Sequence, residues 1–140
     1  MYISLKGLFA ALSSLLIITA PQSVSEVKVE YTVTETRHSK QDFIDFLIQC
    51  ESGGNDKAIN PRDRDGSPSW GLLQFKPDTL YKYVKRYSIL PSIESQEIMN
   101  VIFDGELQVR VLKEMLEDPA VDWYREFPDC YRRWIASGRK

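Results

Sequence analysis

The sequence predicts a mainly α-helical domain, because apolar residues recur at helical spacing and helix-breaking residues separate the stretches in which they do so. Apolar side chains follow one another at intervals of three and four residues in three stretches, around residues 43–50, 80–87 and 98–115; this is the period of an amphipathic helix. Glycine or proline follows each stretch, at Gly53-Gly54, Pro91 and Pro119. The chain has 140 residues, 43% of them hydrophobic, so it suits one compact domain of three to five helices around one core.

The first residues have the features of a secretory signal peptide. Lys6 is the only charged side chain in residues 1–25, and residues 8–20 are apolar apart from three small hydroxyl residues. This run is shorter than the roughly 20 residues of a membrane-spanning helix, and Ser23-Val24-Ser25 provides a small-x-small cleavage pattern. We therefore expect residues 1–25 to be removed on export to the periplasm, the cell envelope or the medium. An uncleaved anchor is the alternative, and it would be the chain's only link to a membrane.

Residues 26–38 alternate between apolar and polar side chains, at the period of two that is typical of extended chain. No partner strand is evident, so we expect a linker or an edge strand there. The helical domain is then expected to occupy residues 39–140.

The first helix of this domain is expected at residues 40–52. Ser39 is a suitable N-cap, and Asp42, three residues on, completes a capping-box pattern. Gly53-Gly54 ends the helix because glycine adopts the left-handed C-cap conformation at little cost. The apolar stripe of this helix consists of Phe43, Phe46, Leu47 and Cys50, widened by Ile44 and Ile48.

A polar loop is expected at residues 55–70, and an apolar segment at 71–75 leads to a second helix from Pro77 to about Tyr87. A third helix, capped by Ser92 or Ser95, is expected to continue to near Pro119. Gly105 would lie inside it, where glycine costs about 1 kcal/mol relative to alanine; a close helix–helix approach would explain that residue. The segment from Asp122 to Trp134 is rich in aromatic residues.

The two cysteines, Cys50 and Cys130, are expected to form a disulfide if the chain is exported, because secretory compartments are oxidising. The bond would close a loop of about 80 residues and contribute roughly 4 kcal/mol by the loop-entropy argument. Two separate buried thiols are the alternative.

Charge and composition exclude several other classes of function. The formal net charge is -2 and no cluster of basic residues occurs, so no nucleic-acid partner is expected. His38 is the only histidine; it is expected to be exposed, and it cannot supply a Ser-His-Asp triad centred elsewhere. One histidine and two cysteines do not make an ordinary zinc site, so neither a metal nor a cofactor is expected.

Glu51 is the strongest candidate for a catalytic residue on local grounds. It lies in the last turn of the first predicted helix, where the negative end of the helix dipole disfavours a carboxylate. It also lies beside the apolar stripe of that helix. Both effects raise the pKa of a carboxyl group, which is the property that a general acid needs.

One stretch of the chain carries a motif. It consists of Glu51-Ser52-Gly53-Gly54, Ala58, Asn60-Pro61, Gly66, Ser69, Gly71-Leu72-Leu73-Gln74-Phe75, Pro77 and Thr79. This order resembles the catalytic core of the soluble lytic transglycosylase family in the lysozyme-like superfamily, with Leu73 in place of the usual methionine. Residues 100–105 (NVIFDG) are similar to the family's Asn-Ile-x-x-Gly helix. The resemblance covers about residues 40–117.

The resemblance implies a lysozyme-like helical domain with its catalytic glutamate at the end of a helix, and we expect the chain to be a monomer. Glu51 would protonate the β-1,4 glycosidic oxygen between N-acetylmuramic acid and N-acetylglucosamine of peptidoglycan. It would then draw the proton from the muramic acid 6-hydroxyl, which leaves 1,6-anhydromuramoyl ends. Gln74 would line the sugar cleft, and Ser52 or Ser69 would hydrogen-bond near the glutamate or the sugar.

The sequence departs from the family near its C-terminus. The family's Ala-Tyr-Asn-Ala-Gly stretch, whose tyrosine lies close to the catalytic glutamate, is absent, and residues 127–134 (FPDCYRRW) stand in its place. Tyr131, or else Tyr124, is the candidate to replace that tyrosine. Aromatic residues elsewhere could stack on sugars, although at helical spacing they are more often core: Trp70, Tyr81, Tyr83, Trp123 and Trp134.

Two alternatives to the transglycosylase remain open. A hydrolytic muramidase on the same fold usually needs a second carboxylate, and the candidates are Asp56, Asp63, Asp65 and Asp78. A non-catalytic wall-binding protein would keep the fold without the reaction.

Overall fold

The computed structural model describes residues 38–139, so the predicted signal peptide and all of the predicted extended segment except His38 lie outside the described residues. Helices dominate, which confirms the mainly α-helical prediction, and no helix in the described part is long and apolar enough to cross a membrane. The elements are α1 (Lys40–Ser52), β1 (Ile59–Asn60), β2 (Ser69–Trp70), α2 (Pro77–Arg86), the 3₁₀ helix η1 (Ser95–Asn100), α3 (Gly105–Glu117), α4 (Trp123–Glu126) and α5 (Pro128–Ala136).

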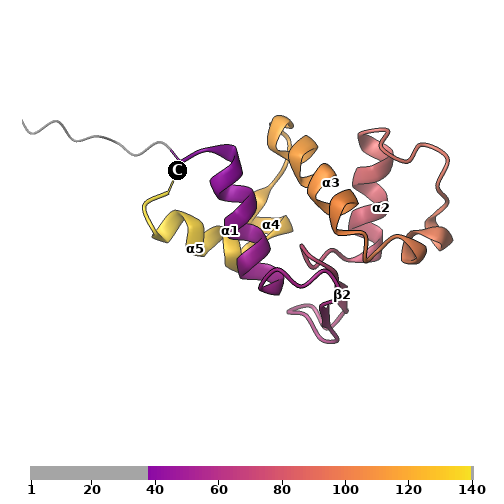
Figure 1. Cartoon of the computed structure of the whole chain (residues 1–140), viewed down its shortest axis with the longest axis horizontal. Helices are drawn as coiled ribbons and strands as arrows, with labels where there is room; N and C mark the ends of the chain where they lie inside the picture. Colours follow the sequence, from indigo (N-terminus) through magenta and orange to yellow (C-terminus); the bar gives the residue numbers. More distant parts are fainter. Residues whose placement is uncertain (1–37, 140) are drawn as a thin grey trace, which may run out of the picture. The chain divides into compact units, whose positions relative to one another are not determined.

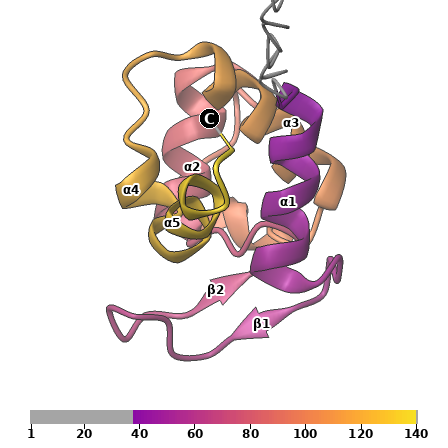
Figure 2. The same cartoon turned by 90° about the vertical axis from the view of Figure 1, so that its left-hand side faces the viewer.

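Helix α1 begins and ends where the sequence predicts. The backbone N–H of Asp42 donates to the Ser39 hydroxyl at 3.1 Å, and the backbone N–H of Ser39 donates to the Asp42 carboxylate at 2.7 Å, which completes the capping box. Gly53 has a φ of 65° and caps the other end. The helix buries Phe43, Ile44 and Leu47. Its C-terminal turn, which carries Glu51, lies above the β1–β2 hairpin (Figure 2).

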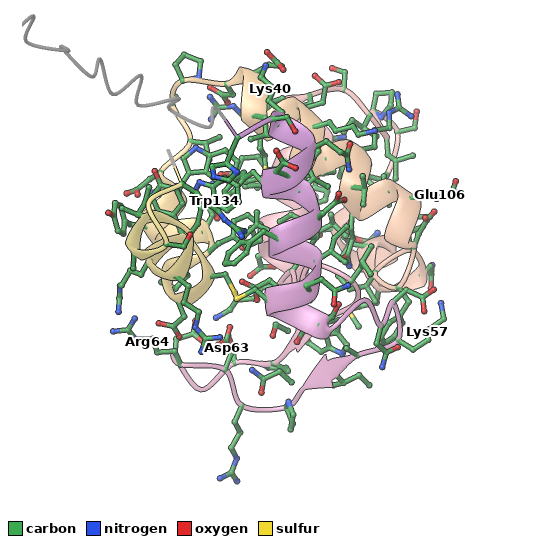
Figure 3. The ribbon with its side chains drawn as sticks, turned by 60° about the vertical axis from the view of Figure 1, so that its left-hand side comes forward. Lys40, Lys57, Asp63, Arg64, Glu106 and Trp134 are labelled. Carbon is green, nitrogen blue, oxygen red and sulfur yellow. A yellow bond between two sulfur atoms is a disulfide. The ribbon has the colours of Figure 1, made fainter. Side chains whose placement is uncertain are left out.

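The β1–β2 hairpin occupies the segment predicted as a loop. Ile59 pairs with Trp70 and Asn60 with Ser69 in an antiparallel register. Each strand has two residues, which is too short for an alternating pattern to show in the sequence. The hairpin matters for the site because residues 61–68 between its strands extend beneath α5, where Figure 3 places Asp63 and Arg64.

The prediction of one long third helix is wrong. Helix η1 ends at Asn100, and α3 begins at Gly105 with Asp104 as its N-cap. The Asp104 carboxylate accepts from the backbone N–H of Leu107 at 2.9 Å, so a capping residue inside the apolar pattern starts a new helix. Gly105 therefore lies in the first turn of α3, and its close neighbours are not another helix. A Cβ there would lie 3.4 Å from side-chain atoms of Asp56 and Leu72.

The aromatic C-terminal segment forms α4 and α5, which pack on each other, while α5 also packs on α1 (Figure 1). Trp134 is buried, and its ring meets Phe43 edge to face with 4.9 Å between the ring centroids. His38 packs on the edge of Trp134 at 5.5 Å. It is therefore half-buried, and the prediction that it is exposed is wrong. This packing makes α5 the partner of α1 and brings Cys130 to Cys50.

Candidate active site

A cleft of about 480 Å³ lies between the C-terminal end of α1, the hairpin loop and the start of α2 on one side and α4 and α5 on the other. The residues that matter for chemistry come from all of these elements. They include Glu51, Asp63, Asp65, Gln74, Asp129 and Arg133. Glu51 and Gln74, which the sequence predicts to share a cleft, do so.

The Glu51 carboxyl group is the acid whose pKa stands out in this cleft. Burial first, and then the negative charges of Asp63 and Asp129, raise its pKa to about 7, although the guanidinium of Arg133 lowers it. The raised pKa agrees with the expectation from the sequence, which shares burial as a cause but does not include the neighbouring carboxylates. Desolvation comes first, and the neighbouring carboxylates come from the hairpin loop and α5, which no local pattern around residue 51 reveals.

Two of the four predicted second-carboxylate candidates line the cleft. Asp63 and Asp65 do so, while Asp56 and Asp78 do not. Lys76 at the start of α2 pairs with both, at 3.6 Å to Asp63 and more closely to Asp65. Hydrogen bonds from Lys76 and Ser67 hold the pKa of Asp65 far below its usual range, so Asp65 is a permanent anion. Asp63 is the candidate that adds its charge to the surroundings of Glu51.

Gln74 is held in place by hydrogen bonds to the hairpin. Its Nε2 donates to the carbonyl of Gly71 at 2.8 Å and to that of Ala58 at 3.3 Å, and its Oε1 accepts from the Ser69 hydroxyl at 3.1 Å. Ser69 is buried and does not line the cleft, so its contact is with Gln74. Gln74 therefore joins the hairpin to the cleft wall, and Ser69 acts through it.

Gln108 on α3 is a positioning residue that sequence reasoning misses. Its buried side chain accepts from the backbone N–H of Leu73 at 2.6 Å and donates to the carbonyls of Ile102 and Trp70, at 2.5 and 3.1 Å. Gly71 leaves room for it, because a Cβ there would collide with Gln108 Nε2 and approach the Ile102 carbonyl to 2.9 Å. The turn that ends in Gln74 is thus fixed from behind by α3.

Two predicted site residues are not brought to Glu51. The Ser52 hydroxyl donates to the carbonyl of Ile48 at 3.2 Å within α1, and Ser52 does not line the cleft. Tyr131 packs on Tyr124, with 4.7 Å between their ring centroids, and lines a separate groove with Phe43 and Trp123. Because Cys130 faces α1, the next residue along α5 points to another side of the helix, so neither Tyr131 nor Tyr124 replaces the family tyrosine beside Glu51.

The aromatic candidates for sugar stacking also lie outside the cleft lining, which holds Phe75 and Phe127 instead. Tyr83 is buried, and its hydroxyl donates to Glu126 at 2.8 Å. Trp134 belongs to the core. In the described part of the chain, no group of three His, Cys, Asp or Glu side chains is placed to hold a metal ion.

The disulfide joins Cys50 to Cys130, with 5.9 Å between their Cα atoms, which is the pairing expected from the sequence. It links α5 to the last turns of α1, as the yellow bond in Figure 3 shows. Cys50 directly precedes Glu51 and Asp129 directly precedes Cys130. The bond thus holds the two acidic side chains on facing walls of one cleft.

The raised pKa of Glu51 predicts a stability that depends on pH. Between its ordinary value of 4.5 and about 7, the folded chain binds more protons at this site than the unfolded chain. The stabilisation is therefore fully present below 4.5 and is lost as the pH rises through about 7, by at most about 3 kcal/mol. We expect Glu51→Gln to raise the melting temperature relative to the parent more at pH 8 than at pH 4.

Calorimetry at both pH values measures this difference. Glu114→Gln is the matched control, since Glu114 is exposed on α3 and the substitution removes the same charge. A shift that is equal at pH 4 and pH 8 would contradict the raised pKa.

One of the comparisons with known proteins finds a match. The family model described as the transglycosylase SLT domain matches residues 31–126. The match ends at Glu126, before α5. Neither the search of curated proteins nor the search of solved structures finds a match.

Proposed function

Because the chain belongs to the transglycosylase SLT domain family, whose members act on peptidoglycan in the cell envelope, we propose that it cleaves the glycan by a non-hydrolytic reaction. The bond is the β-1,4 linkage between N-acetylmuramic acid and N-acetylglucosamine, and the product carries a 1,6-anhydromuramoyl end. The observation that carries the proposal is the half-buried carboxyl group of Glu51 in the cleft, with a pKa of about 7.

Glu51 has the proton affinity that both halves of this reaction require. As an acid with a pKa near neutrality, it gives its proton to the glycosidic oxygen as that bond breaks. The resulting carboxylate then accepts the proton of the muramic acid 6-hydroxyl while the 6-oxygen bonds to C1. One group that serves first as acid and then as base suffices, because the nucleophile belongs to the substrate.

Gln74 and the hairpin would form the floor of the sugar site in this proposal. The amide of Gln74 already makes hydrogen bonds to Gly71, Ala58 and Ser69, so the side chain is held rigidly. Its oxygen keeps one lone pair that can accept a hydrogen bond from a sugar hydroxyl. Gln108 fixes the turn behind it. Positioning of this kind keeps the glycosidic oxygen within reach of Glu51.

Hydrolysis is the second candidate, and Asp63 is the observation that favours it. Asp63 lines the cleft opposite α5 and acts electrostatically on Glu51, so it could orient a water molecule for attack at C1. Asp63 also pairs with Lys76 at 3.6 Å, and this ammonium group competes with a water molecule for the carboxylate. The intramolecular route needs no such group, so we favour it.

Digestion of peptidoglycan in water enriched in oxygen-18 tests the proposal. We expect muropeptides with anhydro ends that contain no solvent oxygen and are lighter by one water than hydrolysis products. Reducing ends that carry the heavy isotope would show a muramidase instead. Asp63→Asn separates the routes further, since it should leave anhydro product formation in place and abolish any hydrolytic fraction.

The cellular setting is part of the same proposal. A chain that acts on peptidoglycan has to leave the cytoplasm, and the disulfide between Cys50 and Cys130 fits an oxidising compartment. We propose that residues 1–25 are a cleaved signal, that residues 39–140 form the catalytic domain, and that it acts as a monomer.

A further inference from the structure

Four cationic side chains line the cleft, and among the described residues three of them pair with carboxylates. Lys76 pairs with Asp63 and Asp65, and Glu126 accepts from Lys82 and Arg125, at 3.1 and 2.8 Å. Arg133 is the exception. Within residues 38–139 no carboxylate oxygen lies within 4.0 Å of its guanidinium, whose one polar contact is the Cys50 sulfur at 4.0 Å.

Arg133 stands beside the proposed acid. It follows Cys130 by three residues on α5, so it lies on the cleft side of that helix, and Cys130 is bonded to the residue that precedes Glu51. Asp129, on the same wall, lies 3.8 Å from Arg64 and 3.7 Å from Arg132. These two arginines flank Asp129, whereas Arg133 lines the cleft together with Glu51 and acts on it electrostatically.

Glu51 does not neutralise Arg133 in the state that starts the reaction. Because its pKa is about 7, Glu51 is largely a neutral acid below that pH. The hydrogen-bond donors of the Arg133 guanidinium are then not paired with a carboxylate of the described residues. Arginine donates two parallel hydrogen bonds to a carboxylate more readily than to any neutral sugar group.

We propose that Arg133 binds a carboxylate of the substrate next to the bond that is cleaved. The inference rests on the proposed function, since peptidoglycan differs from neutral glycans in carrying such groups. Each muramic acid bears a lactyl ether that ends in a free carboxylate on denuded glycan and in an amide where a stem peptide is attached. The peptide supplies carboxylates of its own, so both sources present the same chemistry to Arg133.

Binding to an inactive protein tests this without interference from Glu51. In Glu51→Gln the acid no longer titrates, so an effect of Arg133 that operates through the Glu51 proton disappears. Titration calorimetry then compares Glu51→Gln with Glu51→Gln/Arg133→Gln on three glycans of equal length. The first is denuded, the second is denuded with its lactyl groups converted to neutral methylamides, and the third carries stem peptides.

We expect the loss of Arg133 to raise Kd by about tenfold or more on a carboxylate-bearing glycan, in line with a charge-assisted hydrogen bond, and to leave Kd for the methylamide glycan unchanged. A rise confined to denuded glycan identifies the lactyl carboxylate, and one confined to the peptide-bearing glycan identifies the stem. Arg133→Lys should restore part of the affinity. Arg110→Gln, which removes one charge from the exposed face of α3, should change none of the three values.

Two results would overturn the inference. An equal rise in Kd on all three glycans would show that Arg133 acts on the shape of the cleft, and no rise on any would show that it does not touch substrate. Either result leaves the proposed function intact if the parent releases anhydro products. If the parent releases none and the Glu51→Gln protein binds no glycan, the proposed function itself fails.

Discussion

Glu51→Gln is expected to lower kcat on peptidoglycan by about a thousandfold, with little change in KM. The substitution keeps the size and the hydrogen-bonding oxygen of the side chain but removes the proton that the glycosidic oxygen needs, and general acid–base catalysis contributes roughly 10²–10⁴ in rate. Release of soluble muropeptides from purified sacculi, followed by mass spectrometry, measures the loss. Glu114→Gln, on the exposed face of α3, should keep parental activity.

The same variant separates catalysis from binding. If the protein only binds walls, Glu51→Gln and the parent will release equal and negligible amounts of muropeptide and will cosediment equally with sacculi. If the parent is active and Glu51→Gln retains more than about a tenth of that activity, Glu51 is not the acid. The raised pKa would then reflect burial and the nearby charges without a catalytic role, and Asp63 and Asp129 would be the carboxylates to replace next.

The sequence predicts well those parts of the fold that depend on residues close together in the chain. The capping box of Ser39 and Asp42, the apolar stripe and the two terminal glycines specify α1 and place Glu51 in its last turn. The prediction of a raised pKa follows from that position. The cysteine pair is predictable because a chain with two cysteines has one intramolecular pairing, and export favours it.

The rest of the site is assembled by tertiary contacts that leave no local pattern. In the sequence, Asp104 is one polar residue within an apolar pattern of helical spacing. Only its hydrogen bond from the backbone N–H of Leu107 shows that a new helix begins there. Gln108 is of a residue type that ordinarily predicts a solvated side chain, yet it is buried behind the Gln74 turn. A polar residue on the buried face of α3 was the available signal.

The residues of the wall that faces Glu51 also depend on tertiary contacts. The family pattern suggests a tyrosine there, and Tyr131 is the nearest candidate in sequence. The disulfide at Cys130 and the buried Trp134 fix the rotation of α5 about its axis. As a result Asp129 and Arg133 line the cleft, while Tyr131 lines a separate groove. Which residues line this wall therefore depends less on the residue type that the family pattern requires than on which face of α5 points to the cleft.

Removal of the disulfide is the second large effect that we expect. Cys50→Ala/Cys130→Ala opens a loop of 80 residues, and the loop-entropy argument assigns about 4 kcal/mol to that constraint. For a domain of this size the melting temperature should fall by roughly 15 °C. Urea unfolding of the parent, of the double variant and of the parent kept in reductant measures the loss, and the last two should agree.

Activity measurements show whether the disulfide only stabilises the fold or also positions the residues of the site. Below the melting temperature of the double variant, α5 still packs on α1 through Trp134 and Phe43, so the domain remains folded. Asp129 and Arg133, however, are no longer tied to the turn that carries Glu51, and Asp129 raises while Arg133 lowers the pKa of that acid. We therefore expect the double variant to lose activity at 20 °C and its pH profile to move. A variant that melts earlier but keeps the parental profile would show that helix packing alone aligns the two walls.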